Sequence, residues 1–337
     1  MALQLRKPYL VLVGDETDPT YAKTACGIVH WARDAVAGQY RFSSDAVDLG
    51  VPDLSIAGAA AEGVRSLVIG VAPIGGGVPG AWWQAMKEAA AAGLDVVGGL
   101  HTRLNDNPDL VDIARSSGAK LVDIRTPPAG LPIGTGRKRS GRRVLTVGTD
   151  CAIGKKYTAL ALHAAFEAAG LDATFRATGQ TGIIIAGEGI PMDAVVADFV
   201  AGAAEVLSPD NAPDHWDVIE GQGSLFHPAY SGVSLGLLHG SQPDAVVVCH
   251  EAGRTHVSGW EDFELPSIAQ TIALSENLAS RTNPDVRVVG LSINTSSLAE
   301  PDRADYLAKM RKQHDMPVID PIVDGCDALL SELVLSA

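Results

Sequence analysis

The fold is decided by the stretch Gly148-Thr149-Asp150-Cys151-Ala152-Ile153-Gly154-Lys155-Lys156-Tyr157-Thr158. It follows a short apolar strand at 143–147 and opens into an alanine-rich helical run at 158–169. Glycines let the backbone turn so that several N–H groups point inward. The helix N-terminus adds a partial positive charge, and Lys155 adds a full one. The stretch therefore predicts a phosphate-binding loop between a strand and a helix.

One position departs from the loops that hydrolyse nucleotides. Those loops carry Ser or Thr directly after the lysine, because that hydroxyl ligates Mg²⁺. Here the position is Lys156, and Thr158 comes too late to replace the hydroxyl simply. Lys156 either points to solvent on the first helical turn or supplies a second cation for phosphate oxygens. We expect a loop that grips phosphates and needs no metal, while Mg²⁺ binding stays open.

Composition narrows the class of protein. The chain has 337 residues and a formal charge of −14, which disfavours non-specific binding to nucleic acid or to anionic lipid. No apolar run approaches the ~20 residues of a membrane span, and no signal peptide is recognisable. The four cysteines form no CxxC pair, and the nine histidines show no HxH or HExxH spacing. We expect a cytoplasmic protein with reduced thiols and no histidine-built metal site.

Apolar strands alternate with helical segments along the whole chain, which predicts parallel sheets covered by helices. Strands are expected at 9–14, 66–70, 95–98, 121–124, 143–147, 174–177, 216–220, 245–250, 286–292 and 317–320. Helices are expected at 24–37, 83–92, 108–116, 158–169, 193–206 and 306–314. The predicted organisation is an N-terminal domain at 1–128, a linker at 129–142 and a C-terminal domain at 143–337.

Two further segments allow two interpretations each. The basic run at 137–143 either contacts a phosphate or is a solvated connector, and we favour the connector. The loop Pro73-Ile74-Gly75-Gly76-Gly77 is either a binding loop or a plain turn from strand to helix.

Three polar loops follow strands of the C-terminal half, at 148–158, 178–182 and 220–224. In parallel α/β sheets, ligands bind beyond the carboxyl ends of the strands. The convergence of these loops predicts one site, and the acid-Gly-x-Gly-Ser at the end of the 216–220 strand indicates a P-loop fold.

The candidate catalytic residues are Glu220, His227 and Asp150. Glu220 ends an apolar strand and either handles a proton or caps the next turn. His227 is either a general base or a loop histidine that satisfies the backbone. Asp150 either orients a nucleophile or caps the helix. Arg176 and Gln180 either bind an anionic substrate or are surface residues.

Six long motifs carry a resemblance to a known family. They are KTACGIVHW (23–31), GGGVPGAWW (75–83), GLHTRLNDNP (99–108), VGTDCAIGK (147–155), RATGQTGI (176–183) and VIEGQGSLFHPAYSGVSLGLLHGSQPD (218–244). Over nearly its whole length the chain resembles the D-glutamate N-acetyltransferase-like family, and the loop alone is also similar to that of dethiobiotin synthetase. The resemblance implies an α/β fold, with a small Rossmann-like N-terminal domain before a P-loop-type C-terminal domain. Family members usually carry Met-Thr after the loop lysine, so Lys156-Tyr157 is a departure.

The resemblance also implies an activity: transfer of an acetyl group from acetyl-CoA to the amino group of a D-amino acid, typically D-glutamate. Coenzyme A carries phosphates that such a loop can hold without hydrolysis. The expected cofactor-binding residues are Gly148, Thr149, Cys151, Ala152, Ile153, Gly154, Lys155, Lys156, Tyr157 and Thr158. The expected substrate-binding residues are Arg176, Gln180, Thr181 and Arg254. We also expect a homo-oligomer. The alternatives are an ATP-dependent ligase or kinase of the dethiobiotin synthetase type and a non-catalytic nucleotide-binding regulator.

Overall fold

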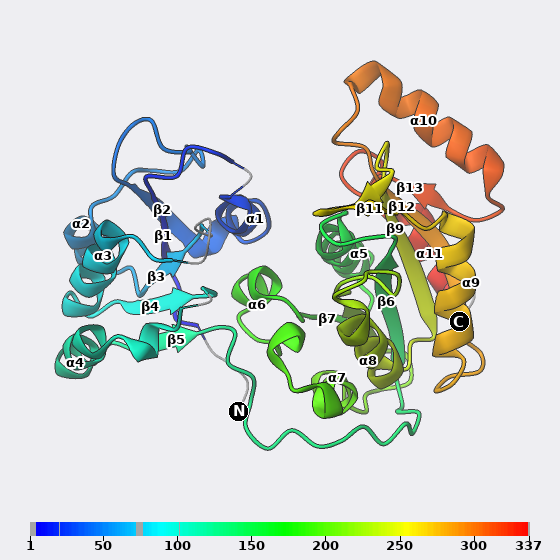
Figure 1. Ribbon diagram of the computed structural model, residues 1–337, viewed down its shortest axis with the longest axis horizontal. Helices are drawn as coiled ribbons and strands as arrows, with labels where there is room; N and C mark the ends of the chain where they lie inside the picture. The colour runs from blue at the N-terminus through cyan, green and yellow to red at the C-terminus, as the bar shows by residue number, and fades with distance from the viewer. Residues whose placement is uncertain (1–4, 20, 72–76, 101, 336–337) are drawn as a thin grey trace. The chain divides into compact units, whose positions relative to one another are not determined.

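The computed structural model describes residues 5–19, 21–71, 77–100 and 102–335 (Figure 1). The chain divides into two compact units. One comprises Met1–Pro127 with Ile183–Pro191, and the other comprises Pro128–Gly182 with Met192–Ala337. The first four residues of the glycine-rich loop predicted at 73–77 lie outside the described residues. Among the described helices, none combines the length and the apolar character needed to cross a bilayer.

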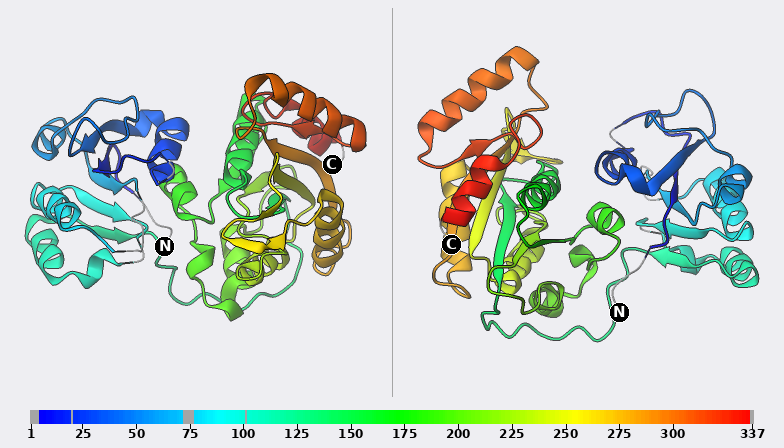
Figure 2. Two further views of the ribbon diagram at one scale, coloured as in Figure 1. Left: turned by 45° about the horizontal axis from the view of Figure 1, so that its top comes forward. Right: turned by 180° about the vertical axis from the view of Figure 1, so that it is seen from behind.

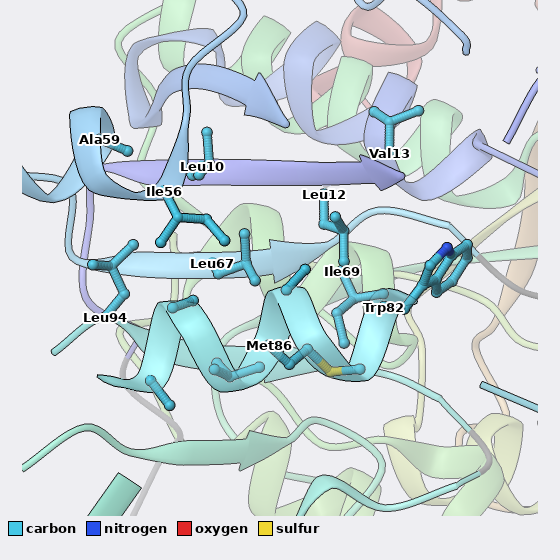
Figure 3. Close-up of a cluster of buried hydrophobic side chains, with 14 of the residues drawn as sticks. Leu10, Leu12, Val13, Ile56, Ala59, Leu67, Ile69, Trp82, Met86 and Leu94 are labelled. Carbon is cyan, nitrogen blue, oxygen red and sulfur yellow. The ribbon is translucent and has the colours of Figure 1, made fainter. Parts of the chain in front are cut away.

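The first unit is built on a five-stranded parallel sheet in the order β2-β1-β3-β4-β5. Its elements are β1 (Tyr9–Gly14), α1 (Lys23–Trp31), β2 (Val36–Arg41), α2 (Ile56–Ala61), β3 (Ser66–Ile69), α3 (Gly80–Ala91), β4 (Asp95–Gly98), α4 (Pro108–Ser117) and β5 (Leu121–Asp123). Figure 3 shows Leu10, Leu67 and Met86 among the side chains packed between the strands and α3. Trp82 on α3 is also buried, and its indole Nε1 donates to Asp15 at 2.7 Å.

The second unit contains a six-stranded sheet in the order β13-β12-β9-β6-β8-β7, with every neighbouring pair parallel. Its strands are β6 (Arg142–Gly148), β7 (Ala173–Arg176), β8 (Trp216–Ile219), β9 (Ala245–Glu251), β12 (Arg287–Asn294) and β13 (Val318–Ile319), and a small antiparallel hairpin is formed by β10 (His256–Val257) and β11 (Trp260–Glu264). Its helices are α5 (Lys155–Ala168), α7 (Val200–Leu207), α8 (Ser231–Ser241), α9 (Ile268–Ala279), α10 (Glu300–Gln313) and α11 (Asp327–Leu335), while α6 (Gln180–Ala186) begins in this unit and ends in the other.

The helices of the second unit cover the sheet in two groups (Figures 1 and 2). α5 packs with α11, while α8 packs with α7 and α9. The strands β7 and β8 lie on one side of β6, and the chain then crosses to β9 on its other side. β6 therefore occupies the topological switch point, where α/β sheets bind their ligands.

Two predicted helices were wrong in extent. The helix expected at 24–37 ends at Trp31, and 36–41 form the buried edge strand β2, whose β-branched and aromatic residues suit a strand. The helix expected at 193–206 is two 3₁₀ turns followed by α7. Helix α8 was missed because glycine is a poor helix former. Gly236 and Gly240 face α7: a methyl group at Gly240 would overlap the carbonyl oxygen of Ala201.

The segment expected to be a solvated connector has no helix or strand at 128–140, and Arg137 is exposed, but Arg139 and Arg143 are not solvated. The Arg139 guanidinium donates to the carbonyl oxygens of Ser208 and Gly240. Arg143 is completely buried and donates to Ser208 Oγ at 2.7 Å and to the Pro209 carbonyl oxygen at 2.9 Å. These cations hold the segment to its own unit, so the solvated connector was the wrong interpretation for both arginines.

Candidate active site

The glycine loop connects β6 to α5 at the centre of the second unit's sheet. Gly154 is the N-cap of α5 at φ 112°, and Ala152 also adopts a left-handed φ of 54°. The first turn of α5 contains Lys155 and Lys156 and no acidic residue. Cations next to the positive end of a helix are electrostatically unfavourable unless an anion joins them. The loop therefore has the charge arrangement of an anion site.

Lys155 is folded back onto its own loop. Its side chain is 6% exposed, and Nζ donates to the carbonyl oxygen of Asp150 at 2.6 Å. Burial lowers the pKa of Lys155, and the nearby thiols and Asp150 oppose that change. An incoming phosphate would offer this ammonium a charged partner in place of a neutral carbonyl.

Asp150 connects the loop to the β10–β11 hairpin. Its side chain is completely buried. One carboxylate oxygen accepts the backbone N–H of Cys151 at 2.6 Å, and the other accepts Arg254 Nη1 at 2.9 Å and the Ser258 N–H at 2.8 Å. The helix-capping interpretation does not hold, because the N-cap of α5 is Gly154.

Arg254 is engaged on three sides. Besides Asp150, it donates to the Cys151 carbonyl oxygen at 2.9 Å and pairs with Glu251. Nearby, Thr149 Oγ1 lies 3.1 Å from His250 Nδ1.

Arg254 and His250 also line a cavity of about 680 Å³, between the chain after β11 and helix α10. This volume is in the range of small-molecule sites.

Glu220 directly follows β8, within electrostatic reach of Lys155 and Lys156. It is 4% exposed, and Oε2 accepts the N–H groups of Thr178 and Gly179, each at 3.0 Å. Burial raises the pKa of Glu220, while Lys156 and these two amides act in the opposite direction. The carboxylate thus stabilises the turn before α6 and also has the raised pKa that suits a general base.

Arg176 is placed differently from the other candidates. Its Nε donates at 2.7 Å to the buried carboxylate of Asp217, which also accepts the Ser208 hydroxyl at 2.5 Å. Arg176 therefore closes a polar cluster between β7 and β8. Gln180 and Thr181 form the first turn of α6, next in the chain to the amides that bind Glu220.

His227 lies beside Asp150 and Cys151, in an aromatic enclosure. Its ring stacks on Tyr230 with centroids 4.4 Å apart and forms a T-shaped pair with Trp260, whose centroid is 4.7 Å away. Sequence reasoning did not identify Tyr230, Trp260 or Ser258 as parts of this site. The one signal was a tryptophan in the otherwise polar segment that forms β11.

The donor atoms of this cluster do not suit a metal. Within the described part of the chain, ligand atoms of Asp150, Cys151 and His227 lie within 4.8 Å of one another. However, both Asp150 oxygens accept hydrogen bonds, and His227 Nδ1 accepts two. Thr158 is no substitute for the missing magnesium hydroxyl, since its Oγ1 is buried against Ser292 at 2.8 Å.

Family models match both halves of the chain. Residues 37–127 match a domain of unknown function described as the DUF1611 N-terminal, Rossmann-like domain. Residues 132–330 match the corresponding DUF1611 C-terminal P-loop domain.

Two curated proteins and one crystal structure are similar over almost the entire chain. A D-glutamate N-acetyltransferase of Tritonibacter scottomollicae is 46% identical, covering 98% of this chain and 99% of its own. A D-glutamate N-acetyltransferase of a Pseudoalteromonas species is 44% identical, covering 98% of this chain and 100% of its own. The crystal structure of a DUF1611 family protein from Anabaena variabilis is 35% identical, covers 98% of this chain and 100% of its own, and superimposes with a TM-score of 0.87. The expected Rossmann-like and P-loop domains are confirmed, and the chain belongs to the DUF1611 family.

Proposed function

We propose that this protein is an acyltransferase that moves the acetyl group of acetyl-CoA to the amino group of D-glutamate. The observation that carries the proposal is the identity of 44–46%, over 98% of this chain, to two proteins named D-glutamate N-acetyltransferase. The site is compatible with that chemistry, because it combines an anion-binding loop with a buried carboxylate of raised pKa.

The glycine loop binds the phosphates of acetyl-CoA in this proposal. Lys155 exchanges the Asp150 carbonyl oxygen for a phosphate oxygen, and Lys156 adds a second positive charge at the same helix end. Coenzyme A needs no hydrolysis at its phosphates, so the absence of a hydroxyl directly after Lys155 is consistent with this role. The reaction needs no metal.

Glu220 is the proposed general base. The substrate ammonium loses a proton to the carboxylate, and the free amine nitrogen adds to the thioester carbon. The tetrahedral intermediate then collapses as the C–S bond breaks, the nitrogen gives up its second proton, the coenzyme A thiolate takes up a proton to leave as the thiol, and Glu220 returns its proton to solvent. The raised pKa of Glu220 makes it a stronger base than an ordinary carboxylate.

The cavity beside Arg254 is the proposed acceptor site. Arg254 lines this cavity and Arg176 does not, although both guanidinium groups are paired with carboxylates. We therefore favour Arg254 over Arg176 as the partner of a substrate carboxylate, whereas Gln180 and Thr181 on α6 do not line this cavity. We further propose that the enzyme is cytoplasmic and forms a homo-oligomer. Light scattering on the purified protein measures the oligomeric state.

The test is release of free thiol from acetyl-CoA in the presence of D- and L-amino acids. We expect release with D-glutamate and little with L-glutamate. If none of the amino acids in the panel supports thiol release, the proposal is contradicted. ATP turnover without thiol release would favour a ligase or kinase of the dethiobiotin synthetase type, and binding without any turnover would favour a nucleotide-binding regulator.

A further inference from the structure

The ring of His227 is held in one orientation. The residue is 2% exposed, and Tyr230 and Trp260 pack against its ring. Its Nδ1 lies 3.1 Å from the backbone nitrogen of Ala229 and 3.2 Å from that of Tyr230. Both backbone groups can only donate hydrogen bonds, so Nδ1 must present its lone pair to them. The ring proton is therefore on Nε2.

The Nε2–H group has no hydrogen-bond partner within the described part of the chain, although it is buried. A ring nitrogen of His227 lies within 4.8 Å of ligand atoms of Asp150 and Cys151, and the Asp150 oxygens already accept Cys151 N–H, Arg254 and Ser258 N–H. Buried donors are almost always satisfied, and exceptions often mark a functional position. A bound ligand with an acceptor oxygen would satisfy this one.

The tautomer restricts what His227 can do. A general base and a metal ligand both need a lone pair on the reacting nitrogen, and Nε2 has none while Nδ1 accepts two amides. Burial also lowers the pKa of His227, with Asp150 and Lys155 acting in opposite directions on it. The ring is thus a neutral donor, of the kind that stabilises charge developing on an oxygen atom.

We infer that His227 is a catalytic residue that donates Nε2–H to the carbonyl oxygen of the bound thioester. This inference rests on the proposed function. When the amine nitrogen adds to the thioester carbon, the carbonyl electron pair moves to the oxygen, and the hydrogen bond from Nε2 strengthens. When the C–S bond breaks, the electron pair returns. No proton leaves His227 at any stage.

The first experiment reads the tautomer directly in the wild-type full chain. Nitrogen–proton correlation NMR of protein labelled with ¹⁵N-histidine distinguishes protonated from bare ring nitrogens, and the spectrum of His227→Gln assigns the signal. We expect Nε2 protonated and Nδ1 bare, with the Nε2–H signal shifting when a non-reactive ketone analogue of acetyl-CoA binds. A protonated Nδ1, or an Nε2–H signal whose chemical shift does not change when the analogue binds, would overturn the inference.

The second experiment is kinetic. His227→Phe keeps the ring shape without a donor and should lower kcat by about 10²–10³-fold, the usual loss for one such donor. His227→Gln can place an amide N–H near the Nε2 position and should retain more activity than His227→Phe, with the acid limb of the pH–rate profile unchanged. Equal losses in both variants, or disappearance of the acid limb, would contradict the donor role.

A control separates this inference from the proposed function. His239→Gln changes a histidine of α8 whose Nε2 lies 3.1 Å from the Leu278 carbonyl oxygen, and it should leave kcat unchanged. If wild-type protein releases no thiol with any amino acid, the proposed function fails, whereas the NMR experiment still decides the state of His227.

Discussion

At the scale of single residues, the side chains of the loop are already occupied in the absence of a ligand. Lys155 is held by the Asp150 carbonyl oxygen, and Arg254 is held by two carboxylates. Ligand binding must therefore exchange partners rather than simply add them. The proposed reaction depends most on Lys155 and Glu220.

Lys155→Ala should lower kcat/KM for acetyl-CoA by one to two decades. A charge-assisted contact to a phosphate contributes about 1–3 kcal/mol, which corresponds to that range. Steady-state kinetics with varied acetyl-CoA measure it. Lys87→Ala is the control, because Lys87 and Asp109 both belong to the first unit and form an exposed ion pair there. Normal acetyl-CoA kinetics in folded Lys155→Ala protein would rule out the phosphate role.

Glu220→Gln should lower kcat by at least about two decades, the usual loss for a general base. Burial raises the pKa of Glu220, so the wild-type enzyme should lose activity as the pH falls through that raised value. The same raised pKa means that ionised Glu220 destabilises the fold above it. Gln removes that charge. The melting temperature of Glu220→Gln minus that of wild type should therefore be higher at alkaline pH than at acid pH.

Circular dichroism establishes that Glu220→Gln is folded, and pH–rate profiles test the base. If Glu220→Gln retains nearly normal activity while the residual activity of His227→Gln has no acid limb in its pH–rate profile, the assignment of the base is reversed.

At the scale of elements, two features hold the site in place. One is the attachment of the β10–β11 hairpin to the glycine loop through Asp150. The other is the close approach of the chain after β8 to the end of β6. There, the Gly221 N–H donates to Thr146 Oγ1 at 2.9 Å, and a methyl group at Gly221 would overlap the Thr146 carbonyl oxygen.

Asp150→Ala should destabilise the protein by about 3–5 kcal/mol, because it leaves Arg254 without one buried partner and the Ser258 N–H without an acceptor. Urea unfolding measures the loss, and hydrogen exchange should rise at 254–264. The control is Asp112→Ala, which breaks an exposed pair with Arg115 and should cost less than about 1 kcal/mol. Similar costs for both substitutions would show that Asp150 holds nothing in place.

Gly221→Ala and Gly232→Ala should have opposite signs. The first forces two backbone segments apart and should prevent folding or lower the melting temperature sharply. The second is in α8 with no atom within 4 Å of the added methyl group, and it should stabilise by about 0.4–1 kcal/mol. Thermal unfolding of both variants is the measurement, and a neutral Gly221→Ala would contradict the packing described here.

At the scale of the whole molecule, the second unit contains the loop, the carboxylate, the histidine and the cavity. Its sheet brings together residues that lie far apart in the sequence, because β8 and β9 flank β6. The proposed reaction uses these residues and no metal ion, which can be tested on the intact enzyme.

Exhaustive dialysis against EDTA should leave both turnover and coenzyme binding unchanged. Acetyl-CoA at 100 times its dissociation constant should stabilise the protein by about 2.7 kcal/mol, with or without EDTA. Thermal unfolding and thiol release are measured side by side, so that loss of binding is distinguished from loss of chemistry. Activity that disappears in EDTA and returns with Mg²⁺ would show that the loop binds a metal after all.

The sequence by itself determined the features that depend on local pattern. The strand-loop-helix order at 143–169 predicted the anion site, and runs of apolar residues located most strands of both sheets. The strand end at Glu220 was recognisable for the same reason. The edge strand β2 and the glycine-containing α8 were not, because their stability comes from partners distant in sequence.

Only the tertiary structure decided how the polar residues are used. Arg139 and Arg143 resemble a solvated basic run in sequence, yet they are buried against carbonyl oxygens of segments more than 60 residues away. Arg176 and Arg254 were equivalent candidates until their partners were known. The proton position on His227 depends on two backbone amides that face its ring. A local pattern identifies which groups are present, whereas hydrogen bonding and burial, which only the folded chain creates, determine their charge and direction.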